Sequence, residues 1–169
     1  MSLTMYRASV PVFVRALGIL SELLKKGEAF AKEQGMSPDA LVQERLREDM
    51  LPLAGQIQRA SDSSKLAVER LTGVAAPKFE DDEATLDQLQ QRIAKTLAYI
   101  QSVSPEAFND SAQREIKLNY GDFQPVFSGE TYLLGFAIPN FYFHIVTAYD
   151  ILRVKGVPVG KRDYLGPYA

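Results

Sequence analysis

His144 is the residue of this chain whose type and setting most directly suggest chemistry. It is the only histidine, and it lies among aromatic residues in a segment that follows Pro139 and has the composition of a buried helix. An imidazole can ligate a metal ion or act as a general acid or base near neutral pH. Because the chain has no cysteine, disulfides, thiolate metal sites and cysteine nucleophiles are excluded. His144 is therefore the leading candidate for a functional residue.

The neighbours of His144 argue against metal chemistry. Phe141 stands three residues before it, where the di-iron pattern requires glutamate, and Ala148 stands four residues after it, where a zincin would have a second histidine. Histidine-based zinc and iron sites usually take three protein ligands, so aspartate or glutamate would have to supply the others. We expect no metal and no cofactor, and a histidine that hydrogen-bonds to a hydroxyl or a carbonyl in the core or in a cleft.

A second group of polar residues lies on the predicted second helix. Gln58, Asp62 and Lys65 are spaced by three and four residues, which puts them on one helix face. Charged residues are mostly exposed, which favours a solvated face with an ordinary Asp62–Lys65 ion pair. The alternative is that this face borders the histidine and forms a polar cleft with it. Two further candidates for that cleft, on the same predicted helix as His144, are Tyr149 and Asp150.

The composition is that of an ordinary globular protein. The chain has 169 residues, 46% hydrophobic and 24% charged, and a formal net charge of −2. These values predict a single domain over residues 1–169, and the charge provides no basic field for nucleic acid. The apolar stretch at 8–14 is too short to span a bilayer and lacks a signal-peptide cleavage site. We expect a soluble, cytoplasmic protein without membrane or nucleic-acid partners.

Helical periodicity covers the first half of the chain. Apolar residues recur at helical spacing from Phe13 to Leu24, and Gly35 ends that pattern. A second pattern extends from residue 41 to Gly73, with Pro52 inside it. A proline disfavours helix at the residue before it, so we expect a break near residues 50–51 and a short separate helix over about 39–47.

The second half adds a hairpin and a last helix. The acidic run 80–83 precedes an apolar periodic segment, 86–100, which predicts a third helix with the acidic run at its N-terminus. Polar and apolar residues alternate on both sides of a Gly-Asp pair, which predicts a β-hairpin over about 114–128. A final helix follows over about 130–155, and the segment 160–168 should dock back on the bundle. The fold class is all-α, a four-helix bundle with a small β-hairpin before the last helix.

Five segments of the chain together resemble an uncharacterised family of unknown function that is itself similar to the DinB/YfiT-like superfamily. They are Tyr6-x-Ala8-Ser9-Val10-Pro11-Val12-Phe13, Gln58-x-Ala60-Ser61-Asp62, Pro77-Lys78-Phe79-Glu80-Asp81, Leu134-Gly135-Phe136-Ala137-x-Pro139-Asn140-Phe141-Tyr142-Phe143-His144 and Gly160-Lys161-Arg162-Asp163-Tyr164-Leu165-Gly166. The resemblance implies a DinB-like four-helix bundle over essentially the whole chain, and a homodimer.

The same resemblance implies where a site would lie. In that superfamily three histidines hold a divalent metal, one on the second helix and a His-x-x-x-His pair on the last, and the typical activities are thiol transfer and hydrolysis. His144 matches the first member of the pair, and Ala148 occupies the second position. The second helix has no histidine, and Gln58 and Asp62 are the nearest polar substitutes. The metal site is therefore expected to be degenerate.

Two hypotheses remain. In the first, the protein is a non-catalytic bundle that binds a small ligand or a partner in a cleft around His144. In the second, it is a hydrolase or transferase with a reduced metal site or with His144 as a general base, oriented by Asp62 or Asp150.

Overall fold

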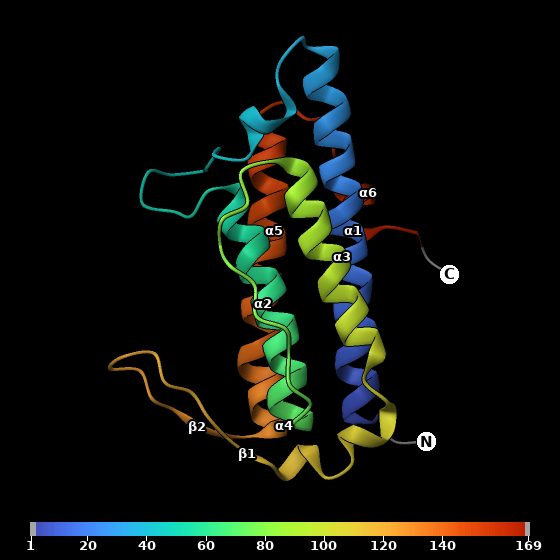
Figure 1. Cartoon of the computed structure of the whole chain (residues 1–169), viewed down its shortest axis with the longest axis vertical. Coiled ribbons are helices and arrows are strands. Elements are labelled where there is room, and N and C mark those ends of the chain that lie inside the picture. The colour runs from blue at the N-terminus through green and yellow to red at the C-terminus, as the bar shows by residue number, and fades with distance from the viewer. Residues whose placement is uncertain (1–2, 168–169) are drawn as a thin grey trace.

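Four long helices form the body of the molecule. The computed structural model describes residues 3–167, and its long helices are α1 (Met5–Glu33), α2 (Leu53–Thr72), α3 (Leu86–Ser102) and α5 (Ile138–Val154). α2 packs against α3 and α5, and α1 packs against the same two helices, so the order around the bundle is α1, α3, α2, α5. α1 and α5 run in one direction and α2 and α3 in the other (Figure 1). The predicted four-helix bundle is confirmed.

The apolar stripes and glycine stops read from the sequence define the helices correctly. Phe13, Leu17 and the other apolar residues of the α1 stripe are completely or almost completely buried in the shared core. The glycines predicted to end α1, α2 and α5 have φ angles of 68°, 79° and 91° at positions 35, 73 and 156. This left-handed conformation is costly for residues with a side chain, which explains why glycine ends each helix.

The segment between α1 and α2 differs from the prediction. α2 begins at Leu53, directly after Pro52, so the predicted break is confirmed. The helix predicted over 39–47 was wrong, because only the 3₁₀ turn η1 (Pro38–Leu41) forms and 42–52 is a loop. Asp39 instead accepts a hydrogen bond from the backbone N–H of Leu86, 2.9 Å away, and so helps to fix the start of α3.

The start of α3 also differs from the prediction. Thr85 is its N-cap, and Thr85 and Gln88 form a capping box. The acidic run 80–83 therefore does not cap the helix, and lies instead in the connection 73–85. Because α2 and α3 are parallel, this connection must return along the length of the bundle, and Figure 1 shows it doing so. Its acidic side chains are thereby brought alongside α2 and α3.

The predicted hairpin is present and projects from one end of the bundle (Figure 1). The turns η2 (Pro105–Phe108) and η3 (Ser111–Gln113) lead into β1 (Glu115–Lys117), which pairs antiparallel with β2 (Val126–Ser128). A further bridge joins Tyr120 to Phe123 around Gly121, whose φ is 66°. The hairpin therefore holds Tyr120 beyond the end of its short ladder.

The last helical segment is not regular throughout. It begins as α4 (Gly129–Tyr132), widens into the π-helical turn η4 (Leu133–Ala137) and continues as α5. The N–H of Ile138 bonds to the carbonyl of Leu133, five residues back. Pro139 has no N–H to continue the ordinary pattern, which accounts for the wide turn at this point.

The C-terminal segment docks on the bundle as predicted over residues 160–167, and Tyr168 lies outside the described residues. α6 (Lys161–Leu165) lies against α1. Lys26 pairs with Asp163 at 2.6 Å, and Arg15 donates to the carbonyl of Leu165 at 2.6 Å. Within residues 3–167, no helix is long and apolar enough to cross a membrane.

Candidate functional site

His144 lines a cavity of about 350 Å³ between α2 and the α4–α5 segment. We call it the α2–α5 groove, and its lining residues are Leu51, Arg59, Asp62, Ser63, Leu66, Arg70, Tyr120, Tyr132, Phe136, Ala137, Asn140 and His144. The α2 residues from 59 to 70 span about 16 Å at 1.5 Å per residue. Because α2 and α5 are antiparallel, Arg59 lies near the His144 end of the groove and Arg70 lies near the opposite end, beside Tyr132.

The ring of His144 is held by a glutamine. Its Nδ1 lies 2.8 Å from Oε1 of Gln56, a buried residue of α2. The amide nitrogen of Gln56 donates to the carbonyl of Leu51 at 3.0 Å, so its oxygen is the acceptor and Nδ1 of His144 carries the proton. The predicted carbonyl partner is confirmed. Nε2 is left with a lone pair.

The same surroundings keep the ring neutral. Burial lowers the pKa of His144 from its ordinary 6.5 to about 4, and the nearby Arg59 guanidinium acts in the same direction. Among the described residues, no carboxylate forms a hydrogen bond or ion pair with the ring. The expectation that Asp62 or Asp150 orients His144 was wrong, because Gln56 occupies that position. An amide does not stabilise an imidazolium as a carboxylate does.

A divalent metal does not fit this site. The part of the chain that the structure describes contains no group of three histidine, cysteine, aspartate or glutamate side chains able to hold a metal ion. Ala148 is fully buried and offers only a methyl group at the position of a second histidine. One ring nitrogen of His144 is already engaged by Gln56.

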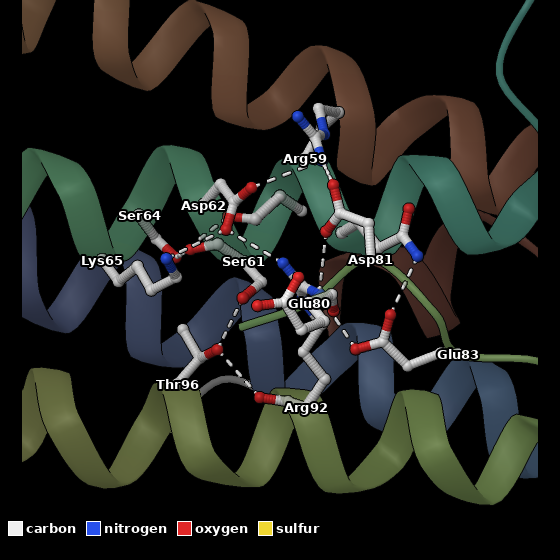
Figure 2. A network of polar contacts seen from close by, with 12 residues as sticks. Arg59, Ser61, Asp62, Ser64, Lys65, Glu80, Asp81, Glu83, Arg92 and Thr96 are labelled. Carbon is white, nitrogen blue, oxygen red and sulfur yellow. Dashed lines mark hydrogen bonds and ion pairs between the residues drawn. The ribbon is translucent and has the colours of Figure 1, made fainter. Parts of the chain in front are cut away.

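On the other side of α2, Arg92 of α3 is the centre of a dense polar network (Figure 2). Its side chain is 1% exposed, and its Nη2 lies 3.0 Å from Asp62. Its Nη1 lies 3.0 Å from Asp81 and 2.9 Å from Glu83, both in the connection before α3. Burial acts to raise the pKa of Glu83, but hydrogen bonds from Arg92 and Gln58 outweigh it and hold the pKa below its usual value.

We call this set the Arg92 network, and its charges balance. Its three cations and three carboxylates are Arg59, Lys65, Arg92, Asp62, Asp81 and Glu83. The Lys65 nitrogen and the Arg92 guanidinium also lie 5.1 and 5.3 Å from the ring centre of Phe79. Within the described residues, Arg92 Nε is the one fully buried side-chain nitrogen or oxygen without a hydrogen-bond partner. The network ties α2, α3 and their connection together.

The polar residues predicted for one cleft are divided between these two regions. Gln58, Asp62 and Lys65 share a face as expected, but that face packs against α3 and the acidic run. The solvated face was therefore a wrong prediction, and Lys65 is only 5% exposed. Of the three, Asp62 also lines the groove with His144.

Two other predicted cleft residues lie away from the groove. Tyr149 packs edge-on against Tyr164 of α6, with ring centres 5.8 Å apart. Asp150 is half-buried, and burial raises its pKa, but neither residue lines the groove. The prediction that they face the same cleft as His144 is corrected accordingly.

Several residues of both regions were missed in the sequence. Arg92 lies within the apolar stripe of α3, between Leu89 and Thr96, and a charged residue at such a position indicates a buried ion pair with a nearby acidic run. Arg70 and Tyr132 gave no comparable signal, because 62 residues separate them and only the packing of α2 against α4 and η4 joins them. Gln56 is one of several polar residues of α2, and nothing in the sequence indicates that its partner is His144.

The architecture is that of a DinB-like helical bundle. A crystal structure described as a DinB family member protein from Shewanella denitrificans matches with a TM-score of 0.90 and 41% sequence identity, covering 97% of this chain and 93% of the other. The chain belongs to the family described as Domain of unknown function (DUF1993), whose sequence profile matches residues 5–165. No curated protein matches it.

Proposed function

We propose that the protein is a non-catalytic binding bundle that holds a small organic ligand in the α2–α5 groove, next to His144. The observation that carries this proposal is the fixed, neutral imidazole in a cavity of about 350 Å³. That volume is within the range of small-molecule sites, and such sites combine apolar walls with a few placed polar groups. Here Leu51, Leu66 and Phe136 provide apolar wall, and His144 provides a placed polar atom.

The unbonded ring nitrogen of His144 determines which ligand group can bind at this end of the groove. Nε2 forms no hydrogen bond within residues 3–167. A fully buried nitrogen without a partner would count as an unsatisfied buried atom, and Nε2 is not such an atom. It is therefore open to the groove or to water. A neutral imidazole nitrogen with a lone pair accepts a hydrogen bond, so the matching ligand group is a hydroxyl or an N–H.

Binding is better supported than catalysis. A ring with a pKa of about 4 is a weak base at neutral pH, and its partner is an amide that cannot offset a developing positive charge. The superfamily's metal site is degenerate in this proposal, because His144 has neither a second histidine at position 148 nor a nearby carboxylate set.

The single histidine makes a direct experiment available. In an untagged chain, the imidazole resonances of His144 are the only ones in a long-range ¹H–¹⁵N spectrum. We expect phenol, which carries one hydroxyl on a flat ring, to shift the Nε2 resonance saturably at millimolar concentration. Ser63→Phe, which fills the middle of the groove, should abolish the shift, whereas Val146→Ala on the exposed side of α5 should leave it unchanged.

Two results would overturn the proposal. The first is the absence of any saturable phenol shift in the wild-type chain, or a shift that persists in folded Ser63→Phe. The second is tight binding of one Zn²⁺ or Ni²⁺ per chain with loss of the His144 Nε2 signal, because a metal site would then be present after all.

A further inference from the structure

The end of the groove opposite His144 contains an arginine that has no counter-charge among residues 3–167. Arg70 of α2 donates from Nη1 to the hydroxyl of Tyr132 at 2.8 Å and from Nη2 to the hydroxyl of Tyr120 at 3.3 Å. Among the described residues, no carboxylate pairs with Arg70, whereas Arg59, which also lines the groove, is paired with Asp62 and Asp81. The groove therefore carries an unmatched positive charge at this end.

The two tyrosines add to the excess of donors. A guanidinium has no acceptor, so the oxygens of Tyr120 and Tyr132 must accept from Arg70, and each keeps its own O–H proton to donate. Neither proton has an acceptor among the described residues. Burial raises the pKa of Tyr132, against the opposing effect of Arg70, so this hydroxyl stays protonated at neutral pH. Three donor groups thus meet where the described part of the chain leaves no further acceptor for them.

Aromatic rings form the wall beside these donors. Phe136 of the π turn stacks with Tyr132 at 6.0 Å and 25°, and with Tyr120 at 6.5 Å and 23°. Tyr132 is almost completely buried, while Tyr120 reaches the site from the projecting hairpin and is half exposed. The wall offers a flat apolar surface next to a positive charge.

We propose that this end of the groove is an anion subsite and that the ligand is a small organic carboxylate with a flat apolar body. A planar guanidinium matches a carboxylate geometrically, and charge-assisted hydrogen bonds are about twice as strong as neutral ones. A single unmatched charge suits a monoanion rather than a phosphate dianion. This inference rests on the proposed function, since it names the ligand class for the same groove.

The test compares two probes of nearly the same shape, benzoate and benzamide, titrated into the untagged protein at pH 7. We expect benzoate to bind at least about tenfold more tightly than benzamide. Arg70→Met should remove that advantage, leaving benzamide affinity within about twofold. The matched control is Arg7→Met, which removes the same charge from an exposed position of α1. It should leave both affinities unchanged.

Further variants and probes distinguish a failure of the carboxylate subsite from a failure of the binding groove. Tyr120→Phe, at a half-exposed position, should weaken benzoate severalfold without weakening benzamide, and it provides the comparison if Arg70→Met does not fold. Equal affinity of the two probes, an Arg70→Met chain that retains the preference, or tighter binding of inorganic phosphate than of benzoate would overturn the carboxylate subsite. A saturable phenol shift at His144 would leave the binding groove itself standing in each of those cases.

Discussion

The two sides of α2 carry similar polar residues, but those residues are paired with one another on one side and left partly unpaired on the other. In the Arg92 network, every charged side chain has a partner of opposite charge, and the contacts join α2, α3 and the connection 73–85. In the α2–α5 groove, Arg70 contacts the hydroxyls of Tyr120 and Tyr132 and the ring of Tyr132, and His144 contacts an amide, so donors and a lone pair are left without partners in the described chain. A network whose charges are paired stabilises a fold, whereas donors and acceptors left unpaired around a cavity are available to a ligand.

Asp62 stands between the two regions and shows why residue type alone does not separate them. It lines the groove, yet its oxygens are engaged by Arg92 and Lys65 at 3.0 Å and by Arg59 at 3.4 Å. It is therefore committed to the network. Its position beside His144 does not make it a partner of the imidazole.

The largest effect is expected from opening the Arg92 network. Arg92→Met leaves three carboxylates without their shared cation, and removing one partner of a buried charge cluster typically costs about 3 kcal/mol. Urea denaturation at pH 7 should show this loss, with Arg92→Lys in between. Lys25→Met, at an exposed ion pair, should stay within about 0.5 kcal/mol of wild type. A change below about 1 kcal/mol for Arg92→Met would contradict the structural role of the network.

A smaller effect is expected from acidifying the groove. The pKa of His144 is about 4 when folded, below its ordinary 6.5, so the unfolded chain takes up the proton more readily. Stability linked to this residue is therefore complete above pH 6.5 and is lost as the pH falls toward 4, by about 2 kcal/mol after allowance for partial solvent access. The free energy of unfolding is measured by urea denaturation at each pH for the wild type and for His144→Gln. The difference between the two gives the contribution of His144. A difference that stays flat between pH 7 and 4.5 would refute it.

The smallest effect is expected from removing Arg70. Because no carboxylate within the described chain depends on it, Arg70→Met should lower the free energy of unfolding by only about 1.5 kcal/mol, the lower end for hydrogen bonds of a charged group, since one of its two bonds goes to the half-exposed Tyr120. The same urea experiment as for Arg92→Met gives a direct comparison of an arginine-to-methionine change on the two sides of α2. Equal losses for both variants would remove the distinction between a structural and a ligand-binding arginine.

Much of the fold followed from local pattern. The stripe from Phe13 to Leu24 and the stops at Gly35, Gly73 and the end of α5 depend on helix periodicity and backbone freedom, which are properties of short segments. The errors came where distant segments compete for the same groups. The acidic run 80–83 had the pattern of a helix cap, but Arg92 and Arg59 bind its carboxylates and Thr85 caps α3 instead.

The sequence by itself determined that the protein is a helical bundle with a hairpin, and that Phe141 and Ala148 stand three residues before and four residues after His144. Only the tertiary structure decided that Gln56 holds the ring and that Arg70 meets Tyr120 and Tyr132 across the groove. The reason is physical. Helix formation is governed by neighbours within a few turns, whereas the partner of a buried polar group is selected by packing between segments 50 to 88 residues apart.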